Sequence, residues 1–374
     1  MHWFSDIHSV EDARRLARGR LPWVIFDYID GSAGSETGAA IARQAFDNIR
    51  LCPRILYNVS EINLSKDALG QTTKLPFGIS PMAMCNLAHP NADVALAALA
   101  AEQNIPLGVS TASTTSMETL LEKSNQNAWF QLYFSGDGVG TMKLVERAKR
   151  AGFKTLVLTV DVPELGRRPR ELRHGFKMPF KIGPKQFIDF ALHPYWTIPS
   201  FINGVPHMAN FDMEGYDFNR MESRALADWS YLDQLRAAWP GNLVVKGVLN
   251  PLDAVTLVNA GVDAIQVSSH GSRQLDSAPA PIRMLGEIRN VVGSDFPLFY
   301  DSGIRSGEDI VKAYAMGADF VFLGRPFLYA LAAKGEKGLK DLVTVLTQEL
   351  QTTLAQIGQH SIKLIKQNVD DYIL

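Results

Sequence analysis

The sequence predicts an α/β fold: a closed (β/α)8 TIM barrel that forms a single domain over residues 1–374. Three observations predict it. Short apolar runs recur from residue 76 onward, most of them are separated by segments of helical length, and polar residues gather where each run ends. Strand and helix in alternation give a parallel sheet buried on both faces. Because polar strand ends converge on one face when such a sheet closes, we favour the barrel over an open doubly wound sheet.

The expected strands are eight runs of five or six residues. They cover residues 76–80, 106–111, 129–134, 155–160, 243–247, 264–269, 297–302 and 320–325. Three of them are preceded by a glycine that follows a helix, in "AGFKTLVLTV", "AGVDAIQVSS" and "MGADFVFLGR". A residue without Cβ adopts the left-handed conformation at the end of a helix at little energetic cost. Each glycine therefore marks the point where a helix ends and the chain returns to the sheet.

Three further segments surround these runs within the barrel domain, which we expect to span residues 76–335. Residues 1–75 form an N-terminal helical extension, in which Ser9 and Asp12 predict a helix start. A long insertion follows the fourth strand, at about residues 165–228. Residues 336–374 are expected to form C-terminal helices.

The insertion contains two stretches with different character. It begins with the basic "GRRPRELR", where Arg167 and Arg170 fit a solvated loop, and continues with an aromatic, nearly uncharged stretch around residues 188–206. Such a stretch either lies on a membrane surface, packs on a neighbouring subunit, or covers the barrel.

Composition narrows the class of protein. The formal net charge is −2, which gives no support to nucleic-acid binding, and Cys52 and Cys85 are too few for a disulfide framework or a cysteine metal site. We expect no bound metal. The N-terminus has no apolar run of leader length and no stretch is long enough to span a bilayer. These features predict a cytoplasmic enzyme, with peripheral attachment to the inner face of the cell membrane if the apolar stretch binds lipid.

The polar strand ends supply candidate catalytic groups. His270 leaves a strand at the functional face, and Asp161 ends another strand where it could orient that imidazole. Lys246 ends an apolar strand, so its ammonium is expected to pair with an acid or to face an electron-rich ligand. A lysine that forms a Schiff base is a competing interpretation. Arg168, Arg273 and Tyr28 are candidates to bind an anionic substrate.

Glycine-rich backbone at the last two strand ends predicts a phosphate site. "DSGIRSG" carries Gly303 and Arg305, and "LGR" carries Gly324 and Arg325. Backbone N–H groups at a helix N-terminus bind phosphate at this position in barrels.

Several motifs in order carry a resemblance to a known family. They are "FQLY", "TVDVPELGRR", "VVKG", "SSHGSRQLD", "DSGIR" and "LGRP". Together they resemble the FMN-dependent L-2-hydroxy acid dehydrogenase and oxidase family over almost the whole chain. "LHPYW" and "GVPHMANF" are most similar to its mandelate and lactate dehydrogenase branch. The resemblance implies FMN, oxidation of an L-2-hydroxy acid such as lactate or mandelate to the 2-oxo acid, and quinone or O2 as acceptor. It also implies a homotetramer, and in that branch a membrane contact through the insertion.

The same resemblance implies a role for each matching residue. His270 is the base that takes the proton from C2 or the hydroxyl of the substrate, with Asp161 stabilising the imidazolium. Tyr133 bonds the substrate hydroxyl, while Arg168, Arg273 and Tyr28 hold the carboxylate. The cofactor residues divide by the part of FMN they meet: Ala83, Ser110, Gln131, Thr159, Lys246 and Ser268 at the ring, Asp301 and Arg305 at the ribityl and phosphate region, and Gly303, Gly324 and Arg325 at the phosphate.

Some positions depart from the family pattern. Ser269 stands where the family has Asn and Ser272 where it has Gly or Ala, which we expect to alter rate or substrate preference. Ala112 stands where the glycolate oxidases of the family have a bulky aromatic residue, so we expect this pocket to admit a larger substrate side chain. Two other functions remain open. One is a barrel that binds FMN or a phosphate but has lost catalytic activity, and the other is an isomerase or lyase.

Overall fold

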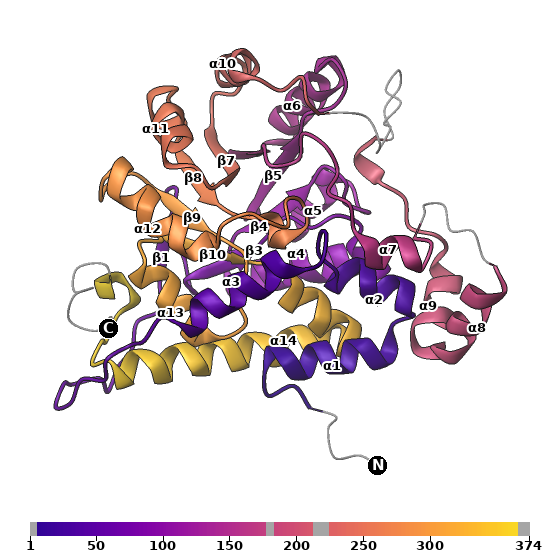
Figure 1. Cartoon of the computed structure of the whole chain (residues 1–374), viewed down its shortest axis with the longest axis horizontal. Helices are drawn as coiled ribbons and strands as arrows, with labels where there is room; N and C mark the ends of the chain where they lie inside the picture. The colour runs from indigo at the N-terminus through magenta and orange to yellow at the C-terminus, as the bar shows by residue number, and fades with distance from the viewer. Residues whose placement is uncertain (1–5, 177–182, 212–223, 366–374) are drawn as a thin grey trace.

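Eight parallel strands close into a barrel in the computed structural model, which describes residues 6–176, 183–211 and 224–365 (Figure 1). Neighbouring strands pair in the order β10-β3-β4-β5-β6-β7-β8-β9. The strands are β3 (Phe77–Ile79), β4 (Leu107–Ser110), β5 (Ala128–Tyr133), β6 (Thr155–Thr159), β7 (Asn242–Val248), β8 (Ala264–Val267), β9 (Leu298–Tyr300) and β10 (Phe320–Leu323). The predicted barrel is confirmed, and each strand overlaps one of the predicted runs.

The interior of the barrel is filled by aromatic and small apolar side chains. Trp129 of β5 lies 5.5 Å from Phe299 of β9 and 5.3 Å from Phe322 of β10, measured between ring centroids. An antiparallel pair, β1 (Lys66–Ala68) and β2 (Gln71–Thr73), packs Ala68 and Leu69 against the same cluster. The barrel is therefore a packed core, which leaves the carboxyl ends of the strands for a binding site.

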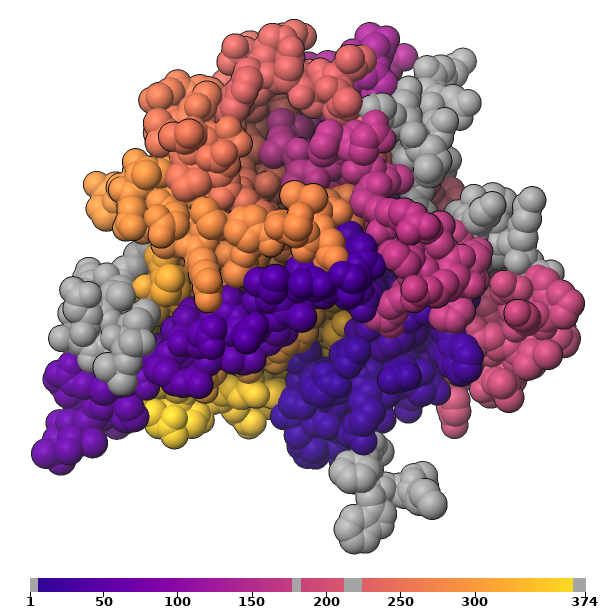
Figure 2. Space-filling view, viewed as in Figure 1, coloured from indigo at the N-terminus to yellow at the C-terminus, as the bar shows by residue number. Residues whose placement is uncertain are grey.

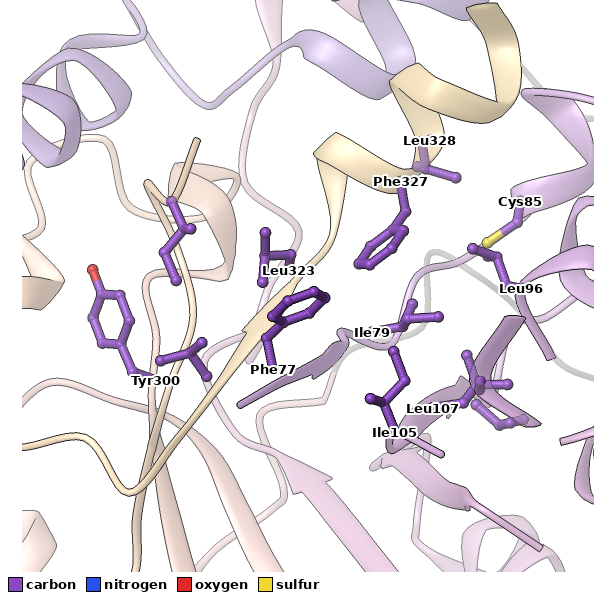
Figure 3. Packing of buried hydrophobic residues seen from close by; sticks show 14 of the residues in the cluster. Phe77, Ile79, Cys85, Leu96, Ile105, Leu107, Tyr300, Leu323, Phe327 and Leu328 are labelled. Carbon is purple, nitrogen blue, oxygen red and sulfur yellow. The ribbon is translucent and has the colours of Figure 1, made fainter. Parts of the chain in front are cut away.

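Helical segments follow the strands, and the α-helices among them surround the barrel. They are η1 (Cys85–Leu87), α4 (Ala92–Gln103), α5 (Met117–Lys123), α6 (Val139–Ala151), α10 (Trp229–Ala238), α11 (Pro251–Asn259), η3 (His270–Ser272), α12 (Pro281–Val292), α13 (Gly307–Ala315) and α14 (Arg325–Gln356). Figure 3 shows the packing between Phe77 and Ile79 of β3, Leu96 of α4 and Phe327 of α14. The predicted left-handed glycines have φ values of 98° at Gly152, 75° at Gly261 and 109° at Gly317.

Three helices precede the barrel: α1 (Val10–Arg20), α2 (Trp23–Asp30) and α3 (Thr37–Asp47). Ser9 caps α1 by accepting a hydrogen bond from the N–H of Asp12, as predicted. Helix α1 lies along α14 (Figure 1). Helix α14 bends at Lys334 and Gly335, so the predicted end of the barrel domain at residue 335 falls inside a helix, and residues 366–374 lie outside the described residues.

The connection between β6 and α10 contains α7 (Pro169–Arg173), α8 (Pro184–Leu192), α9 (Pro194–Asn203) and η2 (Ala209–Phe211). Helix α7 contacts α2, and α9 contacts α1, so this segment lies beside the N-terminal helices (Figure 1). In the described parts of the chain, none of the helices has both the length and the apolar character needed to span a bilayer.

Candidate active site

A cavity of about 220 Å³ opens at the carboxyl ends of the barrel strands. Most of the predicted site residues line it, although they come from segments as distant as α2 and α14. The predicted residues on its wall are Tyr28, Ala83, Tyr133, Arg168, Lys246, His270, Arg273, Asp301, Gly303, Arg305, Gly324 and Arg325.

Four predicted cofactor residues do not line this cavity. Ser110, Gln131, Thr159 and Ser268 are buried at the ends of β4, β5, β6 and β8. The Ser110 hydroxyl donates to Oε1 of Gln131 over 3.0 Å, but Nε2 of Gln131 and Oγ1 of Thr159 are buried without a hydrogen-bond partner. Buried polar atoms are rarely left unpaired in proteins, so these two atoms indicate a polar group that binds at the strand ends.

His270 connects two other predicted residues. Its Nδ1 lies 3.0 Å from Oδ1 of Asp161, and its Nε2 lies 3.4 Å from the hydroxyl of Tyr133. Burial lowers the pKa of His270, although Asp161 acts in the opposite direction. Burial raises the pKa of Asp161, but the interactions with His270 and Lys246 together lower it overall. The site therefore presents a neutral imidazole beside an ionised carboxylate near neutral pH.

The turn that carries His270 has an unusual backbone. His270, Gly271 and Ser272 have φ values of 55°, 61° and 60°, in the left-handed region. The N–H of His270 donates to Oγ of Ser268, and the N–H of Ser272 donates to Oγ of Ser269 over 3.2 Å. Ser269 thus closes the turn from one side, which gives this departure from the family pattern a structural role.

Lys246 is buried in a polar setting. Its Nζ donates to Oγ of Ser268 over 2.9 Å and lies 3.3 Å from Oδ2 of Asp301. Burial alone would lower the pKa of Lys246, but Asp301 and Asp161 raise it overall. A Schiff-base lysine must be neutral to attack a carbonyl, so this protonated ammonium argues against the aldolase-like interpretation.

Two arginines of the cavity share a buried acid that the sequence analysis missed. Oε1 of Glu171 lies 2.7 Å from Nη2 of Arg273 and 3.4 Å from Nη1 of Arg168. The guanidinium of Arg273 also lies 5.3 Å from the ring centroid of Tyr28. Arg168 is the N-cap residue of α7 and Glu171 lies in the first turn, so their spacing of three residues is the signal that could have found this acid.

The last two strand ends combine glycine with cationic side chains. Gly303 has a φ of 84°, and a Cβ there would lie 3.0 Å from the ring of Phe46. Burial lowers the pKa of Arg325 to about 10, and the neighbouring Arg305 and Arg273 add to this effect. An anion such as a phosphate would offset the repulsion between these guanidinium groups. Together with the unpaired atoms at the strand ends, these residues fit an FMN molecule.

The insertion adds three wall residues that the sequence analysis did not identify, Leu165, Met208 and Arg224. The prediction of a solvated Arg170 is wrong, because its guanidinium donates to carboxylates of Asp27, Asp30 and Glu36. No cluster of metal-binding side chains occurs within the residues that the structure describes.

Comparison with known proteins agrees with this geometry. The family model for FMN-dependent dehydrogenases matches residues 17–371. The chain is 38% identical over 360 residues to an (S)-mandelate dehydrogenase of Pseudomonas putida, covering 94% of this chain and 91% of that protein. It is 35% identical over 376 residues to an L-lactate dehydrogenase of Xanthobacter autotrophicus, covering 97% and 96%.

A crystal structure of the monotopic membrane protein (S)-mandelate dehydrogenase superposes with a TM-score of 0.93 at 37% identity. The superposition covers 98% of this chain and 99% of the mandelate dehydrogenase chain. Since the family model and both relatives cover nearly the whole chain, the protein belongs to the FMN-dependent dehydrogenase family.

Proposed function

We propose that this protein oxidises an L-2-hydroxy acid to the corresponding 2-oxo acid, with His270 as the base. The observation that carries the proposal is that His270 and Tyr133 line one cavity, with Asp161 in contact with the other ring nitrogen of His270. An ionised Asp161 keeps the imidazole proton on Nδ1, so Nε2 is free to accept the proton that the substrate loses. Bound FMN supplies the chemistry of electron acceptance.

The substrate carboxylate is assigned to Arg168 and Arg273, with Tyr28 beside them. Guanidinium groups bind carboxylates through two parallel hydrogen bonds, and this interaction is strong in a site with little water. Arg168 is buried, and Arg273 and Tyr28 are held against each other. Tyr133 is assigned to the substrate hydroxyl, because its own hydroxyl faces Nε2 of His270.

The cofactor is assigned to the residues that the family resemblance implies. Lys246 would sit where negative charge develops on the reduced ring, and its raised pKa keeps a cation there. The buried atoms of Gln131 and Thr159 support ring binding at the strand ends, with Ser110, Ser268 and Ala83 nearby. The ribityl chain and phosphate are assigned to Asp301, Gly303, Arg305, Gly324 and Arg325.

A membrane quinone is the electron acceptor that we propose. Helices α8 and α9 expose large apolar side chains, including Leu192, Tyr195, Phe201 and Ile202, which are between 71% and 88% exposed. Figure 2 shows this segment at the edge of the molecule, next to the N-terminal helices. Several exposed apolar side chains on two helices in contact are typical of a membrane or protein contact. The similarity to a monotopic membrane protein supports the membrane.

We also propose that the chain assembles as a homotetramer. Ile55, Leu56 and Tyr57 form a second exposed apolar group, far from α8 and α9 in the sequence, with exposures of 80%, 100% and 50%. An exposed group of this kind is suited to a subunit contact. Light scattering of the purified protein tests this, and a monomer mass at micromolar concentration would contradict it.

The first test of the reaction is anaerobic. L-Lactate, glycolate and L-mandelate are added separately to the purified protein, and the visible flavin spectrum is followed. We expect at least one acid to bleach the flavin of the parent protein. We expect none of them to bleach the flavin of the His270→Ala variant. A protein that fails to bleach with any of these acids and also with the dicarboxylic L-2-hydroxyglutarate contradicts the proposal, and so does a His270→Ala variant that bleaches at the parent rate.

The acceptor is tested by reoxidation and by vesicle binding. Slow recovery of the spectrum in air with fast recovery by a ubiquinone analogue is expected, whereas fast recovery in air would identify an oxidase. Phe201→Ser combined with Ile202→Ser should reduce co-sedimentation with phospholipid vesicles. Leu252→Ser, which removes a side chain 76% exposed on α11, is the matched control. Equal sedimentation of all three proteins would contradict the membrane contact.

A further inference from the structure

We propose that Arg224 forms a second anion subsite in the cavity, and that the substrate is a 2-hydroxy acid whose side chain ends in a second carboxylate. This inference rests on the proposed function and names the substrate class of the same site. It concerns a residue to which the family resemblance assigns no role.

The position of Arg224 carries the argument. Arg224 lines the cavity and is only 7% exposed, and its guanidinium carbon lies 5.1 Å from the ring centroid of Tyr133. Its backbone N–H donates to the carbonyl of Pro163 over 3.0 Å, which fixes the end of the insertion to the segment after β6. The cation is therefore held beside the tyrosine whose hydroxyl faces His270.

Arg224 is separate from the two cationic groups already assigned. Arg168 and Arg273 share Glu171, and Arg273 lies against Tyr28. Arg305 and Arg325 belong to the ends of the last two strands. Arg224 comes from the insertion and lies against a different tyrosine, so one molecule could meet the first pair with one carboxylate and Arg224 with another.

The rest of the wall favours an acid with a short aliphatic spacer. Val162, Leu165 and Met208 line the cavity together with the small Ala112. Apolar side chains accommodate methylene groups, while a buried guanidinium binds a carboxylate more strongly than in water.

The test compares ligands that differ only in the second carboxylate. Binding of 2-oxoglutarate and 2-oxovalerate to the oxidised holoenzyme is measured by calorimetry, and flavin reduction by L-2-hydroxyglutarate and L-2-hydroxyvalerate is measured anaerobically. We expect the dicarboxylate to bind about 10- to 100-fold more tightly than its partner, as for one charge-assisted hydrogen bond. The same preference is expected in kcat/KM for reduction.

Three variants separate the contribution of Arg224. Arg224→Gln should abolish the preference while leaving binding of 2-oxovalerate within about twofold, and Arg224→Lys should keep part of the preference. Arg167→Gln removes an exposed arginine of the same insertion and should behave as the parent. Flavin content and the unfolding midpoint show whether each variant is folded.

Several results would overturn the inference while leaving the proposed function intact. One is a parent enzyme that is reduced by monocarboxylic hydroxy acids and binds both oxo acids equally. Another is an Arg224→Gln variant that keeps the preference, or that loses affinity for both ligands equally and so acts through Tyr133. If no hydroxy acid reduces the flavin, the proposed function itself fails.

Discussion

Replacing Asp161 with Asn tests the catalytic arrangement most directly. Asparagine has nearly the same shape and can still accept a hydrogen bond from Nδ1 of His270, so the substitution removes mainly the charge. In the parent, Oδ1 of Asp161 lies 3.0 Å from Nδ1 of His270, and both side chains are less than one-fifth exposed. The variant should therefore report how much the carboxylate stabilises the imidazolium formed during the reaction.

The expected loss can be bounded from this distance. Two unit charges 3.0 Å apart interact by about 5.5 kcal/mol at an effective dielectric constant of 20, which is an upper limit. A hydrogen bond to a charged group contributes about 1.5–3 kcal/mol net, and each 1.36 kcal/mol changes a rate about tenfold. We therefore expect flavin reduction to slow by roughly 100-fold, and by no more than about 10⁴-fold.

The pH dependence of kcat/KM provides an independent test, because the direction of its shift in Asp161→Asn can be predicted. His270 acts as a base only when it is neutral, so kcat/KM falls as the pH drops below its pKa, which burial sets below the usual 6.5. Asp161 raises that pKa, so its removal should lower the pKa further and move the acid limb to lower pH. The variant is expected to be slower and at the same time active to lower pH.

Stopped-flow reduction under anaerobic conditions, with the substrate concentration varied at each pH from 4.5 to 8, measures both the reduction rate and kcat/KM. Asp253→Asn, in the exposed first turn of α11, serves as the matched control. The reasoning is refuted if Asp161→Asn reduces its flavin as fast as the parent, or if its acid limb moves to higher pH.

Two further predictions concern stability and cofactor binding. Arg170→Met leaves Asp30 with fewer partners and should lower the free energy of unfolding by about 1–3 kcal/mol in urea titrations at pH 7. Because the folded pKa of Asp30 is lowered, its stabilising contribution is present above the unfolded pKa of about 3.9 and disappears as the pH falls through the folded pKa, so the difference should shrink in acid. Gly303→Ala should lower the free energy of unfolding by about 1–3 kcal/mol and reduce the amount of bound flavin. The reason is that φ is positive at Gly303 and the new Cβ would contact the ring of Phe46. Gly293→Ala has a similar φ but open space around its Cβ, so it should lose stability without losing flavin.

The barrel could be predicted because its signals are local. Each strand is a short apolar run, each of three helix ends carries a glycine, and the polar residues stand at the strand ends. The pairing of Asp161 with His270 followed from this placement, although 109 positions separate them. Parallel strands bring their carboxyl ends to one face, so the fold itself supplies the contact.

The insertion could not be interpreted in the same way. Arg170 looked like part of a solvated basic loop, yet it contacts acids of α2 and the loop that follows, far away in the sequence. Glu171 was not among the predicted site residues, although it lies between two arginines of the cavity. Periodicity shows which face of a helix is apolar, but it does not show which distant charges that face will meet.

This contrast suggests how the protein divides its chemistry. His270 and Lys246, with the acids that set their pKa values, belong to strand ends or the turns that follow them, where the barrel fixes their positions. Met208 and Arg224 come from the insertion, and they line the same cavity without belonging to a strand. Changes in the insertion can therefore alter the substrate side chain that fits while the base and its carboxylate stay in place. On this argument, the unexpected residues of the insertion are the ones to examine for substrate preference, and Arg224 is the first of them because it is buried, charged and next to Tyr133.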